Sequence, residues 1–323
     1  MKRILAGMLC ASAVLGSTAV FAADTPHFFY IVKDGNDAWF LDEVAGAKAE
    51  AERLGAQFTS QNVEFDANLA VSGVDTAIAS GAAGLVVVVP EQQIGPAVMQ
   101  KAADANIPII AVDDGIVDSA GNAAPFVGFS SVEAGKQVGN AIADMYESLG
   151  WGEAGPETAI ITAEAQTVSV CMDRTENAIA VLKDRLGMTE EQVIHLAVPE
   201  SQDNAMTTAS QAIIAYPNVK RWLIAACNDN GVLGVVRALE QAGYTADDMI
   251  GVGVNGQIAC EEFKKPEATG FRGSIYVDSA KHGEAAIRAL HEYVTAGTPI
   301  PEKTIIAGTL ITKDDNEISC GKS

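Results

Sequence analysis

Short apolar runs alternate with amphipathic stretches along most of the chain. The runs FFYIV (28–32), GLVVVVP (84–90) and IPIIAVDD (107–114) are apolar at nearly every position. Continuous apolar runs are typical of parallel strands that helices cover on both faces. Strands are predicted at 28–32, 58–63, 84–90, 107–114, 125–129, 158–163, 193–198, 221–226, 250–254, 273–277 and 304–312. Helices are predicted at 37–54, 67–79, 94–105, 131–149, 174–185, 204–215, 231–242, 258–265 and 279–296.

This order of elements predicts an α/β fold with two similar lobes. A glycine-rich loop at 150–156 interrupts the alternation, which then starts again. A chain of 323 residues has room for two such units. We therefore expect two Rossmann-like lobes, each a parallel sheet flanked by helices.

The first 22 residues have the pattern of a cleaved signal peptide. Lys2 and Arg3 precede an apolar segment at 4–14, and Ala22 ends a plausible cleavage site. This apolar segment is shorter than the roughly 20 residues that a membrane-spanning helix requires. The sequence therefore predicts export to the periplasm.

Charge and cysteine content exclude several classes of function. With 42 acidic and 21 basic residues, the chain has a formal charge of −21, which disfavours binding to nucleic acid or anionic lipid. The histidines are dispersed, and the cysteines show no C-x-x-C spacing, so neither a metal nor another cofactor is predicted. A disulfide is chemically possible in the periplasm, but its partners remain open among Cys171, Cys227, Cys260 and Cys320.

Polar residues follow several of the predicted strands. Lys33, Asp37 and Trp39 follow the first strand, and Asp113 and Asp114 end the strand at 107–114. Adjacent residues in an extended chain point to opposite faces, so one aspartate can face a ligand while the other orients a neighbour. Because ligands bind at the carboxyl ends of parallel strands, these residues predict a polar cleft. Asn228 and Asn255 follow strands in the second lobe.

Other interpretations of these residues exist. The aspartates and asparagines could be turn or capping residues, Lys33 a solvated turn residue, and Trp39 part of the core. The GVGVNG segment (251–256) fits the letters of a dinucleotide-binding motif, but its glycines interleave with strand valines instead of opening a helix. The carboxylates lack an activated nucleophile or metal set beside them, so we do not predict an enzyme.

The chain resembles the type I sugar-binding-protein family of ABC transporters, and within it the periplasmic arabinose-binding subfamily. The resemblance is carried by VKDGNDAWF (32–40), IIAVDD (109–114), VKRWLIAACNDNGVLGVVRALEQAGY (219–244), IGVGVNG (250–256) and ATGFRGSIY (268–276). It implies two lobes joined by a three-segment hinge, with lobe one at 24–130 plus 278–307 and lobe two at 131–277 plus 308–323. It also implies capture of a monosaccharide and delivery to a membrane permease, with a chemoreceptor as a further partner and a monomeric state.

The resemblance also assigns roles to residues. Lys33 would donate to a ring hydroxyl, with Asp37 nearby in place of a glutamate. Trp39 would stack on the sugar beside Phe40, and Asp114, next to Asp113, would accept from the anomeric hydroxyl. The remaining contacts would come from Arg174 to the ring oxygen, and from Asn228 and Asn255 to hydroxyls.

Three departures from the arabinose-binding pattern bear on specificity. Phe129 and Cys227 stand where the subfamily has methionines, and Ile258 stands where it has an acidic residue, unless Gln257 replaces that acceptor. The segment 164–173 is about two residues longer, so the assignment of Arg174 crosses a gap. L-Arabinose is the first expectation, and galactose, fucose and xylose are alternatives. The fold also occurs in sugar-responsive repressors, but here a signal peptide stands where the DNA-binding helices would be.

Overall fold

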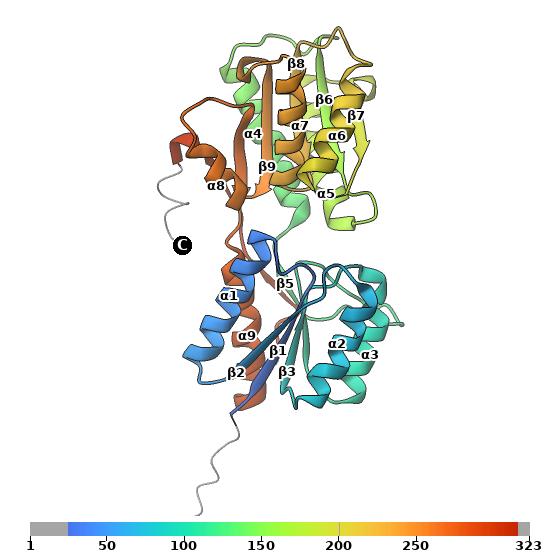
Figure 1. Cartoon of the computed structure of the whole chain (residues 1–323), viewed down its shortest axis with the longest axis vertical. Coiled ribbons are helices and arrows are strands. Elements are labelled where there is room, and N and C mark those ends of the chain that lie inside the picture. The colour runs from blue at the N-terminus through green and yellow to red at the C-terminus, as the bar shows by residue number, and fades with distance from the viewer. Residues whose placement is uncertain (1–24, 200, 316–323) are drawn as a thin grey trace, which may run out of the picture.

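The computed structural model describes residues 25–199 and 201–315 and shows two α/β lobes (Figure 1). The predicted signal peptide and Cys320 lie outside the described residues. Across its width, the sheet of lobe one contains β11 (Lys303–Ile305), β5 (Phe126–Gly128), β4 (Ile109–Val112), β3 (Gly84–Val87), β1 (His27–Val32) and β2 (Gln57–Asn62). The sheet of lobe two contains β12 (Thr309–Thr312), β10 (Phe271–Tyr276), β9 (Met249–Asn255), β8 (Arg221–Ala226), β6 (Thr158–Glu164) and β7 (Val193–Ala197).

Helices flank both sheets. Those of lobe one are α1 (Ala38–Arg53), α2 (Ala67–Ala79), α3 (Gly95–Asp104) and α9 (Ser279–Ala296). Those of lobe two are α4 (Ser131–Ser148), α5 (Ser169–Leu186), α6 (Gln202–Ile213), α7 (Asp229–Gln241) and α8 (Gln257–Phe263). Short 3-10 turns are η1 (Gln92–Ile94), η2 (Glu190–Gln192), η3 (Ala246–Asp248) and η4 (Lys313–Asp315). Each sheet separates two apolar cores, which confirms the predicted fold class.

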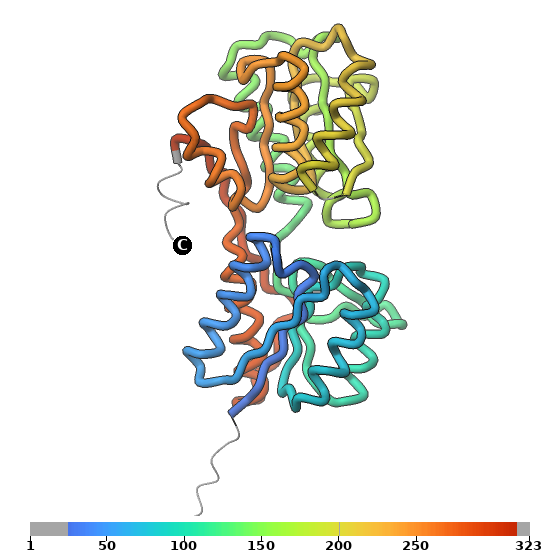
Figure 2. Tube along the Cα trace, viewed as in Figure 1, coloured from blue at the N-terminus to red at the C-terminus, as the bar shows by residue number. Residues whose placement is uncertain are grey.

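Neighbouring strands are parallel in both sheets except for the pair β10–β12. Within the described residues, the chain passes between the lobes after β5, after β10 and between β11 and β12, as the trace in Figure 2 shows. These connections form a three-segment hinge. Because parallel strands align their carboxyl ends, both sheets present those ends toward the region between the lobes (Figure 1).

Two sequence predictions were wrong. The predicted strand at 304–312 is two strands, β11 and β12, in different sheets. Both halves have strand-like sequence, and only the tertiary structure separates them by a hinge crossing. Helix α5 begins at Ser169, five residues before the predicted start, so Arg174 lies within the helix.

Close helix packing fixes the positions of two helices that reach the cleft. Helix α1 packs on α9, where a side chain on Gly46 would collide with the backbone of Ala280. Helix α4 packs on α5, where a side chain on Gly135 would collide with the carbonyl of Arg174. Glycine permits both approaches because it has no Cβ atom.

Candidate functional site

A cleft of about 290 Å³ lies between the two lobes. This volume is near the lower end for small-molecule pockets, about 300–1,000 Å³. All eleven sequence-predicted site residues line it: Lys33, Asp37, Trp39, Phe40, Asp113, Asp114, Phe129, Arg174, Cys227, Asn228 and Asn255. The structure therefore brings together residues that lie up to 222 positions apart in the sequence.

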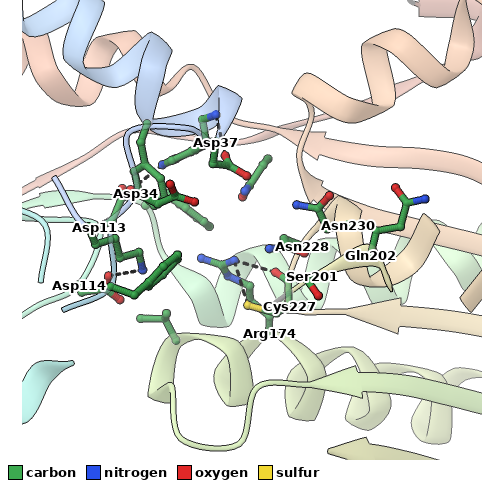
Figure 3. A pocket seen from close by; sticks show the side chains of 17 residues that line it. Asp34, Asp37, Asp113, Asp114, Arg174, Ser201, Gln202, Cys227, Asn228 and Asn230 are labelled. Atoms are coloured by element: carbon green, nitrogen blue, oxygen red, sulfur yellow. Dashed lines mark hydrogen bonds and ion pairs between the residues drawn. The ribbon is translucent and has the colours of Figure 1, made fainter. Parts of the chain in front are cut away.

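The cleft also contains six residues that the sequence did not indicate. They are Asp34, Phe65, Val170, Ser201, Gln202 and Asn230. Figure 3 labels Asp34, Ser201, Gln202 and Asn230. Asp34 and Asn230 are neighbours of predicted positions, so their strand-end locations were the available signal. The other four lie on loops or at helix starts whose direction follows from tertiary packing. Neither Gln257 nor Ile258 lines the cleft, and the Gln257 amide instead donates to Ser279 Oγ at 3.1 Å.

Lys33 and Asp114 form a buried ion pair at the lobe-one wall. Lys33 Nζ donates to Asp114 Oδ2 at 2.7 Å, and the two side chains are only 9% and 4% exposed. The same ammonium lies 5.4 Å from the centre of the Phe40 ring. A desolvated pair of this kind keeps a donor and an acceptor in fixed positions beside the cavity.

Asp113 anchors the indole of Trp39. The Trp39 Nε1–H donates to Asp113 Oδ2 at 2.5 Å, and His282 Nδ1 lies 2.7 Å from the other oxygen. Phe129 meets the indole edge-on, with ring centres 5.9 Å apart. Asp114 thus pairs with Lys33, whereas Asp113 holds the indole of Trp39. The expectation that one of these aspartates orients a neighbour is confirmed, and contact of the other with a ligand stays a prediction.

Asp113, Glu43 and His282 lie close enough together to shift one another's pKa values. Burial would raise the pKa of Asp113, but the hydrogen bond and charge of His282, with Glu43 and Trp39, lower it to about 2. Burial and then the charge of Asp113 raise the pKa of Glu43 well above its ordinary value. Tyr30 donates to Glu43 at 2.6 Å. Glu43 therefore keeps its proton to a higher pH than Asp113 does.

In the described part of the chain, Glu43, Asp113 and His282 are the one group whose donor atoms are close enough to hold a metal ion, within 4.8 Å of one another. Asp113, however, already accepts from both Trp39 and His282, and Glu43 accepts from Tyr30. We therefore interpret the group as a hydrogen-bond network that supports the cleft wall.

Arg174 enters the cleft from helix α5 in lobe two. Its Nη1 donates to the carbonyl oxygen of Cys227 at 2.7 Å, and its guanidinium carbon lies 4.6 Å from the centre of the Phe129 ring. Cys227 is joined by a disulfide to Cys171 in the first turn of α5. The structure thus pairs Cys171 with Cys227, a choice that the sequence left open.

Asn228 and Asn255 complete the lobe-two wall, and the buried Asp229 supports the backbone next to Asn255. Asn228 caps α7 by accepting from the Gly231 N–H at 3.1 Å, which leaves its amide hydrogens for the cleft. Asn255, the last residue of β9, has a φ of 105°, and Gly256 after it has a φ of 97°. Asp229 accepts from the Gly256 N–H at 2.9 Å and thereby holds the junction between β9 and α8. Burial raises the pKa of Asp229 to about 7.

Asp37 is both a helix cap and a cleft residue. Its carboxylate accepts from the Trp39 backbone N–H at 2.8 Å and so begins α1. Burial raises its pKa, although the hydrogen bond from Trp39 acts in the opposite direction. The capping interpretation is therefore correct for this residue, and its place in the cleft is a second property.

Chemically, the cleft offers donors and acceptors of both charge signs around aromatic rings. A ligand rich in hydroxyl groups can donate to the carboxylates and accept from the lysine, arginine and amide groups. The C–H faces of such a ligand can pack on Trp39, Phe40 and Phe129.

The chain matches the model of the periplasmic binding protein domain over residues 28–298. It is 34% identical over 318 residues to the "ABC transporter L-arabinose-binding periplasmic protein" of Azospirillum brasilense, covering 96% of this chain and 93% of that protein. It is 30% identical over 314 residues to the "L-arabinose-binding periplasmic protein" of Escherichia coli K12, covering 95% and 94%.

Solved structures share the fold. A periplasmic solute-binding protein of an ABC transporter from Actinobacillus succinogenes, with bound D-allose, superposes with a TM-score of 0.76 at 20% identity, covering 91% of this chain and 99% of that one. The binding protein of an arabinose ABC transporter from Shewanella sp. ANA-3, bound to L-arabinofuranose, superposes with a TM-score of 0.75 at 16% identity. The superposition covers 92% of this chain and 95% of that one.

The two-lobed fold with its interlobe cleft is that of a type I periplasmic solute-binding protein. With the match over 28–298, the chain belongs to the periplasmic binding protein domain family. No helix in the described ranges combines the length and apolar character needed to cross a membrane.

Proposed function

We propose that this protein captures a monosaccharide between its lobes and delivers it to an ABC importer. The observation that carries this proposal is the assembly of all eleven sequence-predicted contact residues in one cleft. The two L-arabinose-binding relatives, similar over nearly the whole chain, support L-arabinose as the first candidate. In this proposal the chain binds and releases its sugar without converting it.

The proposed contacts combine the positions of these side chains in the cleft with the roles that the family resemblance implies. Lys33 donates to a ring hydroxyl, and Asp114, held by Lys33, accepts from the anomeric hydroxyl. From lobe two, Arg174 donates to the ring oxygen, and Asn228 and Asn255 bind further hydroxyls. Charged partners strengthen these hydrogen bonds relative to neutral ones.

Aromatic side chains supply the remaining surface. Trp39 covers the C–H face of the sugar, with Phe40 and Phe129 beside it. Phe129 and Cys227 form an apolar wall in which a disulfide sulfur replaces a flexible thioether. At the rim of the cleft, the Asp37 carboxylate accepts a hydrogen bond from the sugar.

The proposed setting is the periplasm, reached through the signal peptide at 1–22. The partner there is the membrane permease of an ABC transporter, and a chemoreceptor is a second partner of the sugar-bound form. The protein is proposed to act as a monomer. The alternative within this class is a receptor for xylose, fucose or galactose.

The test is a panel of monosaccharides on the mature protein, residues 23–323, after unfolding and refolding to remove any bound sugar. At 100 times its Kd, a sugar that binds only the folded state adds about 2.7 kcal/mol to the free energy of unfolding. A rise in Tm with L-arabinose supports the proposal, and a rise with another sugar alone reassigns the ligand. A flat panel contradicts it.

A matched pair of variants locates the binding site. Trp39→Ala should abolish the rise in Tm. Leu41→Ala changes a 54% exposed residue of the same helix that does not line the cleft, and it should retain the rise.

A further inference from the structure

The Cys171–Cys227 disulfide joins two segments of lobe two that carry cleft residues. Cys171 lies in the first turn of α5 and is fully buried, whereas Cys227, 3% exposed, connects β8 to Asn228 and lines the cleft. The two cysteines are 56 positions apart in the sequence. The bond therefore links the helix that carries Arg174 to the junction that carries Asn228.

A hydrogen bond extends this link to the guanidinium group. Arg174 lies three positions after Cys171, so both side chains project from the same side of the helix. Its Nη1 donates to the Cys227 carbonyl at 2.7 Å and lies 3.7 Å from the Cys227 sulfur (Figure 3). The disulfide and the hydrogen bond thus close a ring through Cys171, Cys227 and Arg174.

The start of α5 has few other attachments to the sheet. Its N-cap is Val168, whose side chain has no hydrogen-bond acceptor, so the first N–H groups lack a side-chain cap. The buried residues here, Ala165 and the two cysteines, form a small apolar cluster separate from the two cores that flank the sheet. Gln166 and Thr167 are exposed. Helix α4 packs on α5, and Ser169 Oγ donates to Gln92 Oε1 at 2.7 Å, but the disulfide is the covalent constraint that ties this helix end to the residue after β8.

We propose that the disulfide is a positioning element that holds Arg174 and Asn228 in their binding arrangement before the sugar arrives. This inference rests on the proposed function. A preorganised pair loses less conformational freedom on binding than a mobile one, so the oxidised protein binds its sugar more tightly than the reduced protein. The alternative is a bond that stabilises lobe two as a whole without acting on Arg174.

A double-mutant cycle separates these two roles. Cys171→Ala breaks the bond but leaves the cleft-lining Cys227 in place, and Arg174→Met removes the guanidinium while keeping an apolar stem. The Kd for L-arabinose is measured by calorimetry without reductant for the wild-type protein, each single variant and the double variant, so that the bond is intact wherever both cysteines are present. The wild-type protein is also measured under reductant.

If the bond acts through Arg174, Cys171→Ala weakens binding about tenfold alone but less than about threefold when combined with Arg174→Met. If Cys171→Ala weakens binding by the same factor with and without Arg174→Met, the proposal is wrong. An unchanged Kd for Cys171→Ala would also overturn it.

Hydrogen exchange tests the inference without any sugar. In the sugar-free protein, Cys171→Ala should speed exchange of the amides at 169–174 about tenfold and leave α9 in lobe one unchanged. Unchanged exchange at 169–174, or a uniform increase across lobe two, contradicts the positioning role. A flat sugar panel combined with faster exchange at 169–174 would refute the proposed function but not the structural role.

Wild-type protein reduced with a phosphine keeps both sulfur atoms and serves as a second way to open the bond. It should reproduce the exchange pattern of Cys171→Ala. If both forms unfold, the bond determines folding rather than position, and the proposal is wrong.

Discussion

The indole nitrogen of Trp39 donates to the carboxylate of Asp113 at 2.5 Å, and His282 approaches the same carboxylate from helix α9 at 2.7 Å. Helix α9 follows directly on the hinge crossing after β10. The proposed stacking residue is therefore tied to an element that leaves the hinge. The orientation of the ring and the hinge geometry are coupled through one carboxylate, which is 11% exposed.

Asp113→Ala should leave the indole N–H and His282 without their shared partner. Because an unpaired buried polar group costs about 1–3 kcal/mol, we expect a loss of stability of that size and weaker sugar binding. Urea unfolding and calorimetry measure the two effects. The control is Asp34→Ala in the same cleft. The Asp34 carboxylate accepts from the exposed Asn36 N–H, so its loss should change stability by less than about 0.5 kcal/mol. Equal effects of the two variants would contradict this account.

Lys33→Met should be strongly destabilising because it leaves Asp114 buried without its partner. Breaking one side of a buried ion pair costs about 3–5 kcal/mol. Combining it with Asp114→Leu removes the stranded charge and should restore most of the stability, but not sugar binding. Chemical unfolding together with calorimetry tests this. Recovery of binding in the double variant would show that the pair does not contact the sugar.

Asp229 predicts a pH dependence of stability. Its pKa is raised from 3.8 to about 7 in the folded protein, first of all by burial. Between these values the folded protein keeps a proton that the unfolded chain has lost, so rising pH favours unfolding there. The contribution lost between about pH 4 and pH 7 is about 4 kcal/mol. Asp229→Asn should lack this dependence, which urea unfolding across the pH range measures. A constant difference between the two proteins would show that Asp229 does not titrate in that range.

Trp39→Phe should remove the sugar-dependent change in tryptophan fluorescence, because Trp39 is the tryptophan that lines the cleft. Trp222 provides the control. It is fully buried in lobe two, outside the cleft, and its indole nitrogen lacks a hydrogen-bond partner. Trp222→Phe should therefore retain the change. A signal that survives Trp39→Phe and disappears with Trp222→Phe would place its origin in lobe two.

The sequence by itself determined the two α/β lobes and the residues at their strand ends. Hydrophobicity and its periodicity are local properties of a sequence, so continuous apolar runs such as 28–32 indicate strands directly. The carboxyl ends of parallel strands meet at one sheet edge, so Lys33, Asp114 and Asn228 could be assigned to one cleft without knowing their contacts.

Only the tertiary structure decided which side chains meet. Asp113 and His282 are 169 positions apart, and Cys171 and Cys227 are 56 apart. Such pairings depend on how helices and loops pack, and local patterns do not encode them. The same reason explains why Ser201 and Gln202 were missed, and why one apolar segment at 304–312 could not be seen to supply two different sheets.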